Sequence, residues 1–107
     1  MRLENVRLLC MFDLPVETKQ DQKAYRIFRK HLIENGFIMM QYSIYYRTLP
    51  NRSKLQKYEA LIKQKAPKHG NVRLLYVTEK QFQDMKILVG EQTKQEIIIG
   101  SKRMVVI

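Results

Sequence analysis

The sequence predicts an α+β domain in which one antiparallel sheet carries two amphipathic helices. Two observations predict this class. Residues 8–12, Leu-Leu-Cys-Met-Phe, are apolar at every position, which is typical of a strand buried on both faces. Patterns of strand, helix, extended segment, helix and strand then follow one another as far as residue 78. At 107 residues the chain is long enough for one core and too short for two.

The first strand is predicted over Val6–Leu14, and Pro15 ends it. Asp13 lies at its tip, where a buried carboxylate costs free energy unless it is hydrogen-bonded, paired or bound to a cation. One interpretation is that Asp13 caps the turn before the next helix, which is the commoner role for an aspartate. The other interpretation is that it holds a cation. The first strand alone favours the cap and leaves both open.

The first helix is predicted to begin at Thr18, which forms a T-x-x-D capping box with Asp21. It continues to about Asn35, because Gly36 is a helix stop signal. Its predicted apolar side consists of Ala24, Ile27, Phe28, His31 and Leu32.

Another side of this helix is basic. Four cations recur at positions i, i+4, i+7 and i+11, namely Lys19, Lys23, Arg26 and Lys30. An ordinary solvated face is one interpretation of this row. No acid interrupts the row, however, and that favours contacts with phosphate groups.

The segment 37–49 is rich in aromatic and branched residues and predicts extended chain. It is long for one strand, so we expect two short strands hinged near residues 41–43. Three tyrosines in or near these strands, next to two arginines, suggest stacking on nucleic-acid bases. The alternative, which we prefer, is that the tyrosines are half-buried strand residues. The residues concerned are Tyr42, Tyr45, Tyr46, Arg47 and Arg52.

The second half of the chain predicts a helix that begins with a capping box of Ser53 and Gln56 and is terminated by Pro67. A strand over Val72–Thr78 and a helical turn over Glu79–Met85 follow. The order of elements matches the split βαβ plan of ferredoxin-like folds, with both helices on one face of the sheet. We therefore expect a ferredoxin-like domain over residues 1–85 and a C-terminal strand extension over residues 86–107.

The extension is predicted to contain strands at Lys86–Gly90, Ile97–Gly100 and Met104–Ile107. Two helices cover only one face of the sheet, while the first and last strands of the domain are apolar on both faces. The tail or a second copy of the chain must cover the other face. A free tail of branched apolar residues would invite aggregation, so we expect a homodimer in which the tail packs on the partner's sheet.

The chain has 20 Lys and Arg against 10 Asp and Glu, which gives a net charge of +10 and implies a polyanionic partner. Nucleic acid and an anionic membrane surface both qualify, but no apolar run approaches the roughly 20 residues that span a bilayer. Residues 1–5 do not resemble a signal peptide, and the lone Cys10 fits a reducing cytoplasm as a buried apolar side chain. We expect a cytoplasmic protein that does not act on membranes.

Asp13 is the only candidate chemical centre that the sequence offers. A phosphate-binding glycine loop, a Ser–His pair, CxxC and HExxH are all absent from the sequence, and His31 and His69 are too far apart to suggest zinc. Magnesium usually takes one or two carboxylates together with waters and phosphate oxygens. A dimer axis passing near the end of the first strand would bring two copies of Asp13 together.

Several short motifs occur in a fixed order along nearly the whole chain: Phe12–Leu14, Arg26 with Arg29, Gly36, Gln41–Tyr45 and Val72–Val77. In this order and spacing the chain resembles the CRISPR-associated endoribonuclease family, the smaller of the two universal spacer-acquisition proteins. The segment Phe12–Pro15 and the long tail resemble the variant that accompanies a single large RNA-guided effector nuclease.

The resemblance implies a ferredoxin-like homodimer whose tail strand lies on the partner's sheet. It implies a magnesium ion at Asp13 and its symmetry mate, which would make Asp13 both the catalytic residue and the metal ligand. It also implies cleavage of RNA or DNA and a complex with the larger integrase subunit. Many members carry an acid just after the Gln-x-Ser segment, where this chain has Tyr46 and Arg47.

Two main hypotheses follow from these observations. The first is a magnesium-dependent endonuclease acting through Asp13 on RNA or DNA. The second is a non-catalytic scaffold that holds double-stranded DNA for an integrase during spacer acquisition. Single-stranded RNA is a further expected partner. A basic domain that acts at a membrane surface or on the ribosome is a third interpretation, which no specific feature supports. The predicted nucleic-acid-binding residues are Lys19, Lys23, Arg26, Arg29, Lys30, Arg47 and Arg52.

Overall fold

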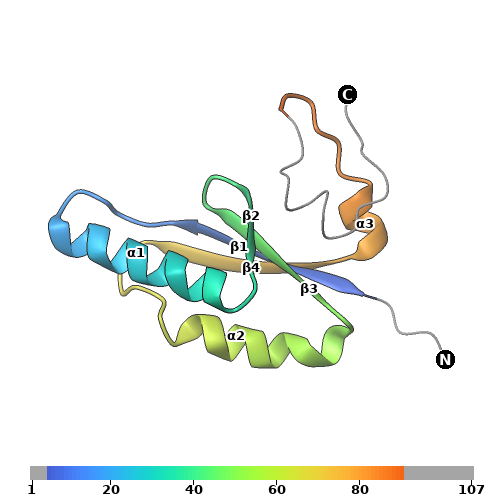
Figure 1. The fold of residues 1–107 in the computed structure, drawn as a ribbon, viewed down its shortest axis with the longest axis horizontal. Coiled ribbons are helices and arrows are strands. Elements are labelled where there is room, and N and C mark those ends of the chain that lie inside the picture. Colours follow the sequence, from blue (N-terminus) through green and yellow to red (C-terminus); the bar gives the residue numbers. More distant parts are fainter. Residues whose placement is uncertain (1–4, 91–107) are drawn as a thin grey trace.

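In the computed structural model, which describes residues 5–90, four strands form one antiparallel sheet in the order β2-β3-β1-β4. This order confirms the predicted ferredoxin-like α+β fold. The elements follow the chain as β1 (Val6–Asp13), α1 (Lys19–Glu34), β2 (Ile38–Gln41), β3 (Ile44–Leu49), the 3-10 turn η1 (Arg52–Lys54), α2 (Leu55–Lys63), β4 (Asn71–Thr78) and α3 (Glu79–Gln83). Figure 1 shows α1 and α2 on one face of the sheet and α3 on the other.

The strand β1 is buried on both faces, as its apolar run predicts. Its alternate residues point to opposite sides of the sheet. One set enters the core under α1 and α2, where the Phe12 ring meets Phe28 edge-on at 5.2 Å and stacks on Tyr45 at 5.7 Å between centroids. Cys10 belongs to the same core, and burial raises the pKa of its thiol to about 12, so it acts as a small apolar residue.

The predicted helix α1 forms with the expected ends. Thr18 and Asp21 make a complete capping box, and Gly36 follows the last turn with a positive φ of 85°. The buried side chains of the helix include Phe28 and Leu32. Ile27, which we expected on the apolar side, is largely exposed. His31, which we also expected on that side, donates a hydrogen bond from its imidazole Nε2 to the carbonyl of Leu61, and this bond connects α1 to α2.

The segment 37–49 forms two strands, as its length predicts. The hinge lies at the expected place, since Ser43 adopts a left-handed φ of 65° between β2 and β3. The backbone N–H of Phe12 donates to the carbonyl of Ser43, which fixes the hinge to β1. Of the three tyrosines in this region, Tyr45 and Tyr46 are 1% exposed, whereas Tyr42 is 82% exposed.

Two local expectations are wrong. The second helix does not begin with a Ser53 capping box, because Asn51 accepts the backbone N–H of Ser53 and starts the turn η1, and α2 begins only at Leu55. The segment Lys86–Gly90 is not a strand: only Ile87 forms a bridge, and Leu88 and Val89 are exposed. Ladder hydrogen bonds define a strand, and they depend on a neighbour that local sequence cannot specify. The strands predicted within residues 91–107 lie outside the described part.

The opposite face of the sheet is covered at one end by α3. Phe82 of α3 packs on Leu9 and Tyr46, and the guanidinium of Arg7 lies over the Phe82 ring at 4.0 Å. Arg7 is almost fully buried and forms a bidentate salt bridge with Glu79. Its Nε donates to Oε2 of Glu79 at 2.9 Å, and its Nη2 donates to Oε1 at 2.7 Å. The bonds from Arg7 lower the pKa of the Glu79 carboxyl. This pair anchors α3 to the first residues of β1.

We predict that Glu79→Gln lowers the free energy of unfolding at pH 7 by about 1–3 kcal/mol. The change leaves the buried guanidinium of Arg7 without a charged partner, and the partial exposure of Glu79 limits the loss. A depressed pKa gives stability that is present above the ordinary carboxyl pKa and is lost as the pH falls through the folded value. The gap between parent and variant should therefore close on acidification from pH 6 to pH 3. Urea denaturation at several pH values measures it.

The matched control is Asp84→Asn, which breaks the exposed Lys80–Asp84 pair of the same segment, 3.5 Å apart. Exposed pairs contribute little, so this change should cost below about 0.5 kcal/mol at either pH. An equal loss in both variants, or a gap for Glu79→Gln that does not depend on pH, would contradict the anchoring role of Arg7 and Glu79.

Candidate nucleic-acid and metal site

Asp13 is the last residue of β1 and lies on the sheet face opposite α1 and α2, by alternation from Leu9 and Met11. Its register partner on β4 is Asn71. Asp13 is exposed, unlike most residues of its strand, and it lines a hollow of about 450 Å³. The lining residues are Met11, Phe12, Asp13, Tyr42, Ser43, Ile44, Asn71 and Arg73.

The backbone around Asp13 is held by Gly70, the residue before β4. Gly70 has a φ of 95°, and a Cβ placed there would lie 2.6 Å from the carbonyl oxygen of Asp13 and 3.1 Å from the Cα of Leu14. Only glycine permits both this conformation and this close approach. The loop before β4 therefore packs directly on the end of β1.

The Asp13 carboxylate has no hydrogen-bond or ion-pair partner within residues 5–90. The hydrogen bond expected if Asp13 capped the turn is therefore not formed within the described residues. Nor do the described residues contain a group of three or more His, Cys, Asp or Glu side chains able to hold a metal. Asp13 fits magnesium as one hard oxygen ligand, and the other ligands would have to come from beyond the described residues of this chain.

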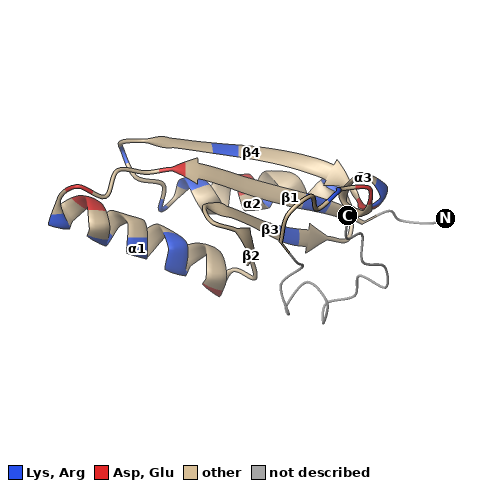
Figure 2. Ribbon diagram, turned by 90° about the horizontal axis from the view of Figure 1, so that it is seen from above, with Lys and Arg blue, Asp and Glu red and all other residues tan. Residues whose placement is uncertain are grey.

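The four cations predicted to form a row on α1 do form one. Lys19, Lys23, Arg26 and Lys30 are all exposed, and none has an ion-pair partner in the described part of the chain. Figure 2 shows the basic segments distributed along α1. The row lies on the helical side of the sheet, whereas Asp13 lies on the other side.

The structure does not bring the remaining three predicted arginines into this row. Arg29 donates from Nε to the hydroxyl of Tyr45 at 2.8 Å. Arg47 is part-buried, donates to the carbonyl of Asn35 at 2.7 Å and lies over Tyr58. Arg52 lies over the ring of Tyr76 at 5.1 Å. Each has a partner within the protein, and their contacts with nucleic acid stay predictions.

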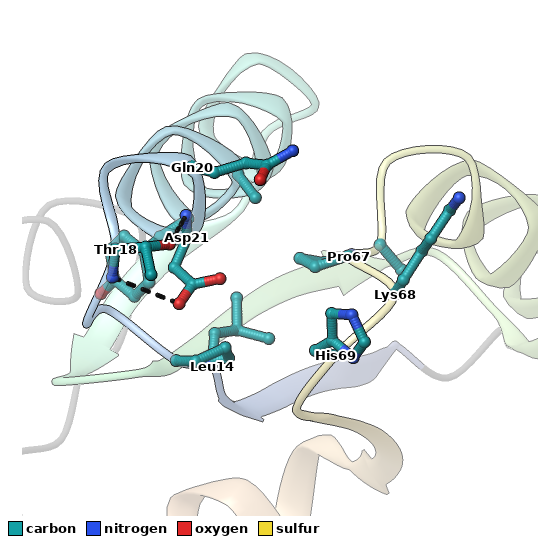
Figure 3. A pocket seen from close by; sticks show the side chains of 11 residues that line it. Leu14, Thr18, Gln20, Asp21, Pro67, Lys68 and His69 are labelled. Atoms are coloured by element: carbon teal, nitrogen blue, oxygen red, sulfur yellow. Dashed lines mark hydrogen bonds between the residues drawn. The ribbon is translucent and has the colours of Figure 1, made fainter.

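A second hollow, of about 520 Å³, lies between the start of α1 and the loop before β4 (Figure 3). Its polar residues Thr18 and Asp21 are bonded to each other in the capping box. Lys68 and His69 line its other side. Lys68 adds a positive charge at this hollow, and the polar groups of the helix start already bond to each other.

Sequence reasoning missed Arg73 and Asn71, the β4 residues beside Asp13. The sequence pattern predicts that the strand Val72–Thr78 is apolar on both faces in its centre, yet the face with Asn71 and Arg73 is exposed. Strand alternation was the available signal, because Asn71, Arg73 and Leu75 occupy the face opposite Val72 and Leu74.

These features define a small ferredoxin-like domain with one basic helix and a single carboxylate at the end of its central strand. Residues 6–85 match the family model described as CRISPR associated protein Cas2. The chain therefore belongs to the Cas2 family. Within the described residues, no helix combines the length and apolar character needed to cross a membrane.

Three relatives illustrate the similarity, and each is named CRISPR-associated endoribonuclease Cas2. The one from Ligilactobacillus salivarius is 47% identical over 84% of this chain and 89% of its own length. The one from Streptococcus mutans strain UA159 is 48% identical over 81% of this chain and 80% of its own. The one from Lacticaseibacillus rhamnosus is 43% identical over 95% of this chain and 100% of its own.

We predict that Gly70→Ala destabilises the protein more than Gly90→Ala does. Both glycines have a positive φ, but a Cβ at Gly90 would meet no atom of residues 5–90 within 4 Å, so Gly90→Ala adds only the strain of a side chain at positive φ, about 1 kcal/mol. Gly70→Ala must also displace the backbone of Asp13, which should cost at least about 1 kcal/mol more. Thermal denaturation of the two variants compares them, and equal shifts would show that the loop does not hold Asp13.

Proposed function

We propose that this chain is a CRISPR adaptation protein that binds double-stranded DNA as a homodimer, together with an integrase subunit. The observation that carries this proposal is the exposed, acid-free row of Lys19, Lys23, Arg26 and Lys30 on one helix. Membership of the Cas2 family and the net charge of +10 support it. Contacts of this kind read the DNA backbone and not its sequence, which suits capture of arbitrary DNA.

The row is long enough to contact several phosphates. Eleven positions of an α-helix span about 16 Å, since the rise is about 1.5 Å per residue. One strand of duplex DNA rises about 3.4 Å along the axis for each phosphate, but it also winds around that axis, so a straight row meets fewer phosphates than its length divided by this rise.

We predict that Lys23→Gln combined with Lys30→Gln weakens binding to all duplex sequences alike. Each lost phosphate contact should lower the slope of log K against log salt by about 0.9, so the pair should lower it by about 1.8 per protomer engaged. Fluorescence anisotropy with two unrelated duplexes across a salt series measures both quantities. Sequence-dependent losses would contradict a backbone-reading role.

The matched control is Lys80→Gln combined with Lys86→Gln. These exposed lysines belong to α3 and the segment after it, and the double change removes the same charge. Because α3 lies on the opposite face of the sheet from α1, the control should leave the salt slope unchanged (Figure 1). Equal slope changes in the two double variants would place the binding surface elsewhere.

A second candidate function is magnesium-dependent cleavage of phosphodiester bonds. The exposed carboxylate of Asp13, which has no partner within residues 5–90, and the endoribonuclease names of the relatives favour it. When bound, magnesium would supply Lewis-acid activation of water and charge stabilisation at the phosphate. Asp13 and its symmetry mate would hold the ion at the dimer axis. A purely non-catalytic scaffold is the alternative, and it needs the same dimer and the same basic row.

We predict that Asp13→Asn affects the stability of the metal-free protein and its magnesium-dependent properties in different directions. Two close carboxylates repel, so the change should leave the metal-free protein as stable as the parent or more stable. It should also abolish both the thermal stabilisation by magnesium and the cleavage of RNA and DNA, because both need the carboxylate. Binding of duplex DNA should persist. Melting curves with and without magnesium, and cleavage assays on repurified protein, measure these effects.

Asp84→Asn makes the same chemical change at the residue after α3 and should keep cleavage and magnesium stabilisation. Sedimentation of parent and variants verifies that they share one oligomeric state. If Asp13→Asn cuts nucleic acid at the parent's rate, Asp13 has no part in the reaction and the scaffold alternative stands.

A further inference from the structure

We infer that the hollow between the start of α1 and the loop before β4 is a docking site for a segment of another protein. One tryptophan or tyrosine side chain of that segment fills the hollow, and acidic residues on both sides of it contact lysines around the hollow. The volume of about 520 Å³ lies within the roughly 300–1,000 Å³ that is usual for binding sites. This surface is distinct from Asp13, and its ligand is distinct from the duplex proposed for α1.

The walls of the hollow are mostly apolar and are held in place by the fold. Leu14 belongs to the buried core, and Tyr25 and Ala66 pack against it. The side-chain amide of Gln22 donates to the carbonyl of Val16 at 3.1 Å, which fixes the turn between β1 and α1. A wall that is already ordered lowers the entropic cost of binding. The apolar lining residues are Leu14, Pro15, Ala24, Tyr25, Ala66 and Pro67.

One hydrogen-bond acceptor in the hollow is uncommitted. The Oδ2 atom of Asp21 accepts the backbone N–H of Thr18 at 3.3 Å, whereas Oδ1 has no partner within residues 5–90. Figure 3 shows Oδ1 on the side of Asp21 that faces Pro67. A ligand that satisfies this site needs a large apolar body and an N–H or O–H donor. Tryptophan and tyrosine side chains combine the two, and they are enriched at the centres of protein interfaces.

Three lysines surround the apolar walls. Lys68 lines the hollow itself, and Lys65 directly precedes Ala66. Lys23 lies one helical turn from the lining residue Gln20 and therefore on the same side of α1. All three lysines are exposed, and none has an ion-pair partner in the part of the chain that the structure describes. This charge complements acidic residues that flank the anchoring side chain.

The same groups disfavour a nucleotide as the occupant. A nucleotide carries its phosphate one sugar away from the base, so an inserted base would bring that negative charge to the Asp21 carboxylate. A peptide backbone is neutral, and its acidic side chains can contact the lysines one or two residues away from the anchor. Residues 91–107 of this chain contain no tyrosine or tryptophan, so they do not supply the anchor.

The test uses the absence of tryptophan from this chain, because the fluorescence of a tryptophan peptide then reports the peptide alone. The probe is the acetylated and amidated heptapeptide Glu-Glu-Gly-Trp-Gly-Glu-Glu, titrated with the full chain in the absence of nucleic acid. Entry of the indole into the hollow should shift its emission to shorter wavelength. A failure of the proposed DNA binding would not affect this signal.

Two matched probes separate the contributions to binding. In one, glutamine replaces all four glutamates, and in the other 1-methyltryptophan replaces tryptophan and removes the indole N–H. Each should bind about 10-fold more weakly than the first probe, because the first lacks the charges and the second lacks the donor for Asp21. Added salt should weaken the glutamate probe more than the glutamine probe.

Ala24→Leu fills the hollow from the α1 wall and should abolish the shift in emission. Ala60→Leu makes the same change at an exposed position of α2 and should retain it. Asp21→Asn keeps an oxygen for the Thr18 N–H but replaces the free acceptor, so the indole and 1-methylindole probes should bind equally. A merely structural loss would weaken both probes and preserve their ratio, so this variant keeps the test decisive if Ala24→Leu fails to fold.

Lys65→Gln combined with Lys68→Gln should remove the preference for the glutamate probe over the glutamine probe. Lys80→Gln combined with Lys86→Gln removes the same charge elsewhere and should retain that preference. Sedimentation and circular dichroism verify that each variant keeps its oligomeric state and fold. The inference is overturned if folded Ala24→Leu binds the probe as the parent does or if the glutamate and glutamine probes bind alike. Displacement of the probe by guanosine monophosphate would also overturn it and assign the hollow to a nucleotide.

Discussion

The rest of the structure depends on the register of β1, the strand that lies between β3 and β4 and is buried on both faces. A slip of one residue would exchange its two faces. Arg7 would then enter the apolar core beneath α1 and α2, without the carboxylate that Glu79 now provides. The buried Arg7–Glu79 pair therefore specifies the register as much as it stabilises the fold, and the register in turn delivers Asp13 to the far end of the strand.

The sequence predicts those features that are set within a few residues of chain. The capping box of α1, its stop at Gly36, the hinge near Ser43 and the exposed basic row all follow local rules, and the structure contains them. The features it did not predict are set by distant residues. Arg7 and Glu79 are 72 positions apart, and the local sequence around either residue does not indicate that they form a pair. Ser53 does not cap the second helix because Asn51 starts the turn η1 two residues earlier, which places Ser53 inside that turn.

The candidate site was predicted only in part for the same reason. Asp13 stands out in the sequence because it ends an apolar run. Its neighbours Arg73 and Tyr42 come from two other parts of the chain, and the sheet register alone unites them. Burial also separated residues that the sequence treats alike: the three tyrosines of residues 42–46 differ in exposure from 1% to 82%, because two of them fall on strand positions and one falls on the turn.

The sheet face that carries Asp13 is covered unevenly. Phe82 shields Leu9 at the α3 end, whereas Leu75, the register partner of Leu9 on the outer strand, is 51% exposed. The bare part of this face therefore adjoins the hollow with Asp13 and Arg73. A second copy packed there would bring two carboxylates and two guanidinium groups to one axis. Two carboxylates that close would repel each other without metal, and a magnesium ion held between them would relieve that repulsion, which is why the proposed metal site depends on a second copy.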